Sequence, residues 1–203
     1  TEEIIRSISS NLQVLEKQRE HLDEQISNLN ILEMSEMVSI SDVCKVIQRA
    51  EMIQKISESV KRDFTELGKE GNIIHMRYRE LLKGIEKAEN EVIRDYSTIP
   101  LKRSKTLLQN LTFDGLLDLE SIARLIFEKT LEEGIHPRGY RFLSHLTLSE
   151  KEISLIVKQL ENLEKILSTD PAALEPILKN RANTIKEEIR NLREQVLSGK
   201  VIC

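Results

Sequence analysis

The stretch from Ile4 to Leu32, IIRSISSNLQVLEKQREHLDEQISNLNIL, decides the fold. Its apolar residues follow one another at intervals of three or four, which is a heptad seam, and only Arg19 interrupts it. The seam consists of Ile5, Ile8, Leu12, Leu15, Leu22, Ile26 and Leu29. Because no glycine or proline breaks the stretch, the sequence predicts one helix about 45 Å long at 1.5 Å per residue. A seam of that length needs a partner helix along it.

Two further long helices are predicted directly after this stretch. Ser39 or Ser41 caps an amphipathic helix that ends at Leu67-Gly68, where glycine tolerates the left-handed conformation. Asn72 opens a third helix, which ends near Tyr96. Three long helices joined by short turns indicate an antiparallel bundle.

The pattern shortens after Pro100. One helix is predicted over residues 102–111, and another begins at Asp114 or Asp118 and stops at Gly134. The run Ile135-His136-Pro137-Arg138-Gly139-Tyr140 then marks a domain boundary. The sequence therefore predicts an all-α chain with a bundle over residues 1–136 and a smaller domain over 137–203.

The smaller domain is predicted to contain short helices. One lies near residues 140–145, and a Thr147-x-x-Glu150 capping box opens the next, which reaches Leu167. Asp170 followed by Pro171 starts a helix of about two turns. The last helix begins near Asn180 or Thr184 and ends before Gly199.

The composition supports an all-α fold and excludes several classes of protein. The 203 residues are 39% hydrophobic, 32% charged and 3% aromatic, with 7 Gly and 4 Pro, which is too apolar for a disordered chain and too poor in turn residues for a β-sandwich. A net charge of −4 excludes a uniformly basic nucleic-acid coat. No apolar run is long enough to span a membrane, and two distant cysteines indicate a reducing cytoplasm.

No catalytic or metal site is predicted in this chain. It has no phosphate-binding loop, no dinucleotide-binding turn and no Gly-x-Ser-x-Gly elbow. Glu133-x-x-His136 is the only match to a di-iron motif, and Gly134 and Pro137 break the helix that this motif needs. We therefore expect no cofactor in this chain.

One local basic patch stands out between residues 176 and 193. It holds five basic residues against Glu187 and Glu188. The five are Lys179, Arg181, Lys186, Arg190 and Arg193. Two interpretations stay open: a solvated helix face, or a surface that contacts a phosphate backbone without reading bases.

Several segments resemble a known family. Ser41-Asp42-Val43-Cys44-Lys45-Val46, Arg49-Ala50-Glu51-Met52-Ile53 and Glu66-Leu67-Gly68-Lys69-Glu70-Gly71 are similar to the helical linker of the DisA diadenylate cyclases. Pro137-Arg138-Gly139-Tyr140-Arg141 resembles the segment that opens the family's C-terminal helix-hairpin-helix domain. The resemblance implies a bundle that joins a cyclase domain, which makes cyclic di-AMP from two ATP, to a DNA-binding tip in a large oligomer.

The sequence departs from the family's pattern in two places. The cyclase motifs Asp-Gly-Ala and Arg-His-Arg are absent, and Thr1 falls about where the cyclase domain should end. ATP and a divalent metal are therefore expected only where that domain is present. In the hairpin, Pro176-Ile177-Leu178 replaces the family's Gly-hydrophobic-Gly, which predicts an impaired phosphate cradle, whereas Arg181-Ala182 matches.

The resemblance implies a non-catalytic linker and DNA-binding-type region that positions cyclase subunits and couples them to branched DNA. We expect weak DNA binding, self-association with other DisA-like subunits, no membrane contact, and a cytoplasmic or nucleoid location. The candidate DNA contacts are Arg138, Arg141, Lys179, Arg181, Lys186, Arg190 and Arg193. The alternatives are a purely structural or oligomerising spacer that has lost DNA binding, and an enzyme whose site the sequence does not reveal.

Overall fold

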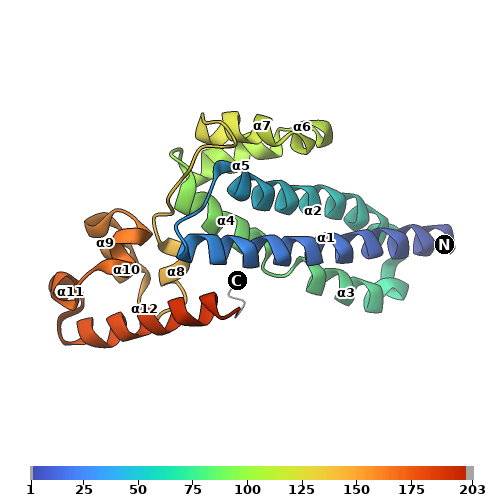
Figure 1. Ribbon diagram of the computed structural model, residues 1–203. Helices are drawn as coiled ribbons and strands as arrows, with labels where there is room; N and C mark the ends of the chain where they lie inside the picture. Colours follow the sequence, from blue (N-terminus) through green and yellow to red (C-terminus); the bar gives the residue numbers. More distant parts are fainter. Residues whose placement is uncertain (1, 200–203) are drawn as a thin grey trace.

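Two long antiparallel helices, α1 (Glu2–Met34) and α2 (Ile40–Leu67), form the centre of the structure. This computed structural model describes residues 2–199, apart from the side chains of residues 66, 69 and 70. The two helices lie side by side (Figure 1). Six seam residues are at most 3% exposed: Ile8, Leu12, Leu15, Leu22, Ile26 and Leu29. The predicted first helix and its buried seam are confirmed, and only Ile5, 36% exposed, lies outside the core.

Two sets of hydrogen bonds fix the start of α2. Ser39 and Asp42 form the capping box, with the Ser39 backbone N–H donating to an Asp42 carboxylate oxygen at 2.9 Å. The segment from Leu131 to Ile135 then runs alongside, with backbone hydrogen bonds such as Ile40 N–H to the Glu133 carbonyl at 2.9 Å. Among the described residues there is no β-strand, only a single bridge between Ser39 and Gly134.

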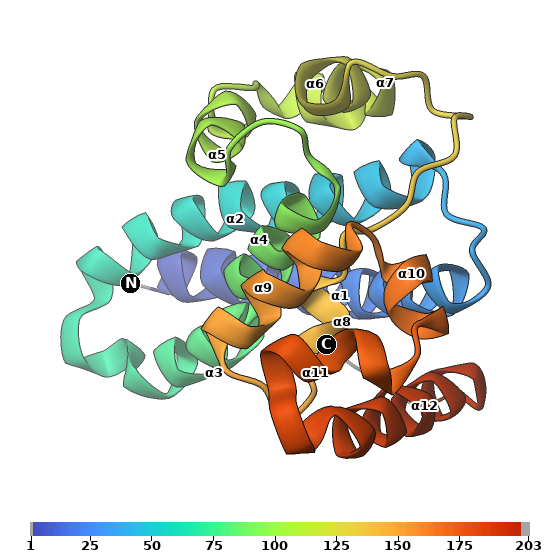
Figure 2. The same ribbon diagram turned by 90° about the vertical axis from the view of Figure 1, so that its left-hand side faces the viewer.

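The predicted third helix is two helices, so this prediction is wrong in one respect. A short 3₁₀ turn, η1 (Gly68–Gly71), leads into α3 (Asn72–Leu82), and α4 (Ile85–Tyr96) follows after a break. Gly84 has φ of +79°, a left-handed conformation that ends one helix and starts the next. The break lets α3 pack beside the N-terminal half of α1 while α4 packs on α2 (Figure 2).

Short helices cover the outer side of α2. They are α5 (Leu101–Gln109), α6 (Phe113–Leu117), α7 (Leu119–Ile122) and the π-helix η2 (Ala123–Phe127). Asp118 caps α7 as predicted, but the helical run stops at Phe127 rather than Gly134, because Glu128 adopts φ of +53°.

Five helices form the C-terminal part. They are α8 (Tyr140–Leu143), α9 (Glu150–Leu160), α10 (Leu163–Ser168), α11 (Pro171–Leu178) and α12 (Ala182–Leu197), with the 3₁₀ turn η3 (Lys179–Arg181) between the last two. The predicted helix that should run to Leu167 is split, because Glu161 has φ of +72° and Asn162 caps α10. Its capping box is Ser149 with Glu152, and not Thr147 with Glu150.

The buried apolar side chains fall into two clusters. One lies between α1, α2, α4 and η2, and the other holds α8–α12 together. Met34, at the end of α1, belongs to the second cluster, and α12 packs against the C-terminal half of α1 (Figure 1). The first helix therefore contributes to both cores. The domain boundary after residue 136 stays a prediction.

Candidate nucleic-acid interface

The helical hairpin α11–η3–α12 carries most of the predicted DNA contacts. Leu174, Leu178, Ala182 and Ile185 are at most 3% exposed and hold its two helices together. Leu178 points into this core, so the residue that replaces the family's second glycine is a packing residue here. Pro176 lies inside α11 on the exposed side and has no backbone N–H to offer a phosphate.

The turn of the hairpin contains a strained residue. Lys179 has φ of +55° and ψ of −123°, a conformation that residues with a side chain rarely adopt. Its side chain is exposed and takes part in no ion pair within the described part of the chain. Lys179 is thus an exposed cation without an ion-pair partner in the described part of the chain, at the point where the two helices meet.

The other hairpin cations are engaged within the protein. Arg181 pairs with Glu152 at 2.8 Å and also donates to the Thr147 carbonyl. Arg190 pairs with Glu187 at 2.7 Å, and both side chains are more than half exposed. An exposed pair such as Arg190–Glu187 contributes little free energy and is easily exchanged for a phosphate.

Lys186 and Arg193 are less available. The Lys186 ammonium donates to the Leu167 carbonyl at 2.7 Å, and its partial burial lowers the pKa of this lysine. Arg193 is half-buried and donates to the Met34 carbonyl at 3.4 Å. These two side chains tie α12 to the end of α10 and to the end of α1, so their first role is structural.

Arg141 does not lie on the surface, which corrects its assignment as a DNA contact. It is 2% exposed, its guanidinium lies 2.9 Å from a Glu33 carboxylate oxygen, and it also donates to the Asn30 side-chain oxygen. Tyr96 donates to the same Glu33 carboxylate at 2.5 Å. A phosphate cannot reach a guanidinium enclosed in this way.

Asp95 completes this cluster. Its buried carboxylate accepts from the backbone N–H groups of Gly139, Tyr140 and Arg141 at 3.2, 2.7 and 3.2 Å. Burial, and then the negative charge of Glu33, raise the pKa of Asp95 to about 7. We call Asn30, Glu33, Asp95, Tyr96 and Arg141 the junction network, because it joins α1 and α4 to α8.

One residue in the sequence indicates this network, although the heptad analysis did not use it. Glu33 stands four residues after Leu29, which is the next position of the buried seam, and it is 5% exposed. A carboxylate at a core position needs a buried partner. The predicted DNA contact Arg141 is that partner.

Arg138 stays near the surface but lies apart from the hairpin. Its side chain donates to the Arg94 carbonyl at 3.1 Å, and its backbone N–H donates to the Asp95 carbonyl at 3.0 Å. The structure therefore leaves Lys179, Arg181 and Arg190 exposed at different points of the hairpin, whereas Arg138 lies where the bundle meets the C-terminal helices.

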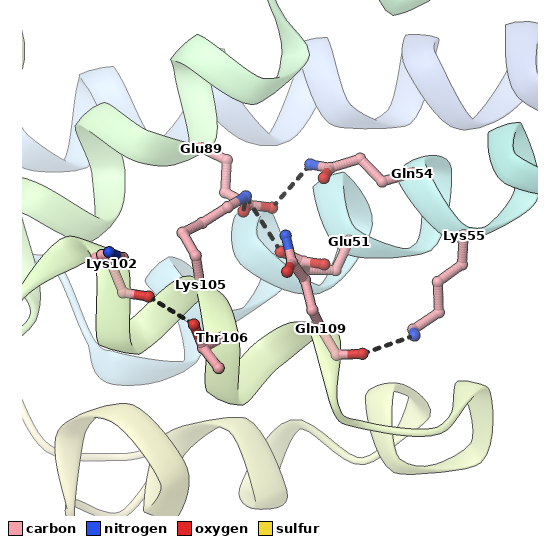
Figure 3. A network of polar contacts seen from close by, with 8 residues as sticks. All are labelled: Glu51, Gln54, Lys55, Glu89, Lys102, Lys105, Thr106 and Gln109. Carbon is pink, nitrogen blue, oxygen red and sulfur yellow. Dashed lines mark hydrogen bonds and ion pairs between the residues drawn. The ribbon is translucent and has the colours of Figure 1, made fainter.

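A second cluster of titratable side chains lies inside the bundle (Figure 3). Glu51 on α2 and Glu89 on α4 are 1% and 0% exposed, and the Lys105 ammonium on α5 pairs with both, at 3.4 Å from Glu51. Burial, and then Glu51, raise the pKa of Glu89 well above its ordinary value. We call these three residues the bundle network.

The bundle network is suited to hold helices together rather than to carry out chemistry. The Lys105 ammonium pairs with both carboxylates, so their negative charges already have a counter-ion within the protein. Throughout the described residues, no group of three or more His, Cys, Asp or Glu side chains could hold a metal ion. Likewise, no helix within residues 2–199 is long and apolar enough to cross a membrane.

The family described as the DisA bacterial checkpoint controller linker region matches residues 1–132. The DNA integrity scanning protein DisA of Clostridium beijerinckii is 34% identical over 208 residues, covering 98% of this chain and 59% of that relative. The protein of the same name from Acetivibrio thermocellus is 33% identical over 204 residues, covering 95% of this chain and 57% of the relative. The chain thus spans somewhat under two thirds of the length of the curated relatives it matches.

Proposed function

The chain belongs to the DisA family, of which it is the linker and C-terminal part, and we propose that it attaches DNA to a cyclase through a helical support. In this proposal the α11–α12 hairpin binds the phosphate backbone of DNA. The bundle holds that hairpin in a fixed position relative to the cyclase domain. The chain itself performs no catalysis, and ATP and a divalent metal belong to the cyclase domain.

One observation carries the proposal: three cations of the hairpin, Lys179, Arg181 and Arg190, are exposed. Lys179 has no ion-pair partner within the described residues, and Arg190 is held only by the exposed Glu187 carboxylate. Arg181 is exposed but pairs with Glu152 and donates to the Thr147 carbonyl. Three such contacts, without base-reading groups, favour weak binding that is independent of sequence and falls with salt. DNA with bends or branches presents more phosphates to one small surface than a straight duplex does, so we propose branched DNA as the preferred form.

The same reasoning gives the partners and the place of action. DNA and further DisA-like subunits are the proposed partners, with the bundle helices as the support on which subunits are arranged. Because the DNA of bacteria lies in the cytoplasm, the proposal locates the chain there.

A second candidate function is a structural spacer that has lost DNA binding. The observation that favours it is the hairpin turn itself, where Pro176 has no N–H and Leu178 is buried in the core. In addition, Lys186 and Arg193 donate to backbone carbonyls rather than reaching into solvent.

Anisotropy titrations with a labelled four-way junction and a duplex of the same length, at three salt concentrations, distinguish the two functions. We expect micromolar or weaker binding near physiological salt. The variant Lys179→Ala/Arg181→Ala/Arg190→Ala should weaken it and flatten the salt slope by about two to three units. Lys151→Ala/Lys158→Ala/Lys165→Ala, on exposed positions of α9 and α10, is a control matched in charge.

The hairpin glycines can be tested without damaging the core. Leu178→Gly would remove a buried side chain at a cost of about 2 to 5 kcal/mol, so only Pro176→Gly is informative. Stronger binding by Pro176→Gly would support a hairpin that uses backbone N–H groups. If neither the parent nor this variant binds DNA at low salt, the spacer function holds.

A further inference from the structure

A surface cavity of about 330 Å³ lies where the bundle meets the C-terminal helices. Arg94 of α4 and Arg138 of the connecting segment both line it, together with the start of α5 and the ring of Tyr140. The full lining is Arg94, Ser97, Thr98, Ile99, Pro100, Leu101, Arg138 and Tyr140. Two guanidinium groups and no carboxylate line this cavity, in a chain whose net charge is −4.

Both arginines are oriented by contacts with uncharged groups. The Arg94 guanidinium lies over the Tyr140 ring, 3.9 Å from its centroid, and Arg138 is fixed by its hydrogen bond to the Arg94 carbonyl. Arg138 takes part in no ion pair within the described part of the chain. Stacking and a carbonyl acceptor orient a guanidinium while its remaining N–H donors stay free.

The nearest anion to Arg94 is a weak competitor. A Glu150 carboxylate oxygen lies 3.7 Å from the Arg94 guanidinium, beyond hydrogen-bond distance, and the Glu150 side chain is 82% exposed. The Asp95 carboxylate is turned away, because it accepts from the backbone N–H groups of residues 139–141. Glu91 also interacts electrostatically with Arg94, but it does not line the cavity, so the lining itself carries two positive charges and no negative one.

From this arrangement we propose that the Arg94–Arg138 cavity is a phosphate-binding site, separate from the hairpin. Planar guanidinium groups bind phosphate oxygens in pairs of hydrogen bonds, and two of them favour a phosphodiester or pyrophosphate group over a single carboxylate. The exposed Thr98 hydroxyl is a further donor at the rim. The phosphate belongs either to a free nucleotide or to a DNA backbone that extends past the hairpin.

A phosphate at this site would contact both parts of the molecule at once. Arg94 belongs to the bundle, whereas Arg138 directly precedes the backbone N–H groups that Asp95 binds in the junction network. Occupancy should therefore stabilise the contact between the bundle and the C-terminal helices.

Calorimetric titration with pyrophosphate and with AMP, and anisotropy with a short DNA duplex, test the proposal on the whole chain. The variant Arg94→Gln/Arg138→Gln should lose about tenfold or more in affinity for at least one of these probes. Glu150→Gln, which removes the competing carboxylate, should strengthen the same binding. Lys179→Gln/Arg190→Gln removes as much charge from the hairpin and should leave pyrophosphate affinity unchanged.

The outcomes separate the sources of the phosphate and also separate this site from the proposed function. Loss of pyrophosphate or AMP binding only in the Arg94/Arg138 variant supports a free phosphate ligand, whereas loss of DNA binding alone supports a backbone phosphate. The proposal is overturned if no probe responds to this variant, or if the hairpin variant loses as much pyrophosphate affinity. Arg138→Gln alone leaves the Arg94–Tyr140 stack intact, and it should still weaken binding if the double variant folds poorly. A DNA response confined to the hairpin variant would support the proposed function while rejecting this site.

Discussion

The junction network and the bundle network carry the same formal charges, but their cations differ in how far they are shielded from solvent. Each combines two buried carboxylates with one cation. The junction network uses Arg141, which is 2% exposed, and three backbone N–H groups that satisfy Asp95. The bundle network uses Lys105, whose side chain is 12% exposed and whose ammonium reaches from α5 to Glu51 and Glu89 (Figure 3).

This difference shows that the contact between the C-terminal helices and the bundle is built like a protein interior. The Arg141 guanidinium has one side-chain hydrogen bond, to Asn30, and one ion pair, to Glu33. A guanidinium with so few partners is fully buried only where packing is tight. A partly exposed lysine can keep part of its hydration, so the helix that carries it is less firmly bound. We therefore expect the C-terminal helices to be fixed to the bundle at least as firmly as α5 is.

The largest effect should come from removing the cation of the junction network. Arg141→Met leaves Glu33 and Asp95 buried without a counter-charge, and breaking a buried pair in this way costs about 3 to 5 kcal/mol. Urea unfolding of the parent and the variant measures this loss. Adding Glu33→Gln to Arg141→Met should recover part of the stability, and two independent, additive effects would contradict the network.

The next largest effect is the change of the free energy of unfolding with pH. The pKa of Asp95 rises from an ordinary 3.8 to about 7 in the folded protein. Between these values the folded protein holds a proton that the unfolded chain releases, so the free energy of unfolding should fall as pH rises from about 4 to 7. The slope from this group approaches about 1.4 kcal/mol per pH unit, and it levels off above pH 7.

The pH effect can be assigned to one network by substitution. Glu89 has a pKa shifted in the same direction, so the bundle network contributes a slope of the same sign. Asp95→Asn should remove the junction part of the slope, and Glu89→Gln the bundle part. A slope in the parent that Asp95→Asn leaves unchanged would show that Asp95 is ionised in the folded state.

Removing the cation of the bundle network should cost less. Lys105→Met leaves Glu51 and Glu89 to share a proton, and the partly exposed position admits water, so we expect a loss of about 1 to 3 kcal/mol. Thermal melts should compare it with Lys102→Met, an exposed lysine on the same helix. If Lys105→Met lowers the free energy of unfolding as much as Arg141→Met does, then the burial of the cation does not determine the size of the loss.

The smallest expected change in stability comes from Lys179, which lies outside both networks and serves as a reference for them. Lys179→Gly relieves the positive φ in the hairpin turn and should stabilise the protein by up to about 1 kcal/mol. Lys179→Ala keeps the strain while removing the same charge, so it should leave stability nearly unchanged. If the two variants melt together, the turn is not strained.

Much of the fold follows from the spacing of apolar residues and from local signals. The seam of α1, the Ser39 cap, the Asp170-Pro171 start and the end of the third helix near Tyr96 all agree with the structure. These features depend on neighbouring residues only, which is why the sequence predicts them.

The missed features depend on contacts between distant segments. Glu161 adopts a positive φ although glutamate gives no such signal, because α9 and α10 must both pack on the C-terminal core. Arg141 appeared to be a surface cation because its partners stand far away in the sequence, at Glu33 and Asp95. The positions of the hairpin cations could be predicted from helical spacing, but their partners could not.

The length of α1 has a mechanical consequence. With 33 residues it is about 50 Å long, and it is a member of both hydrophobic cores. A rod of that length acts as a lever: a tilt of about 5° at one end displaces the other by about 4 Å, which is most of a helical turn. A small rotation of the C-terminal helices would thus displace the N-terminal end of α1 by about 4 Å.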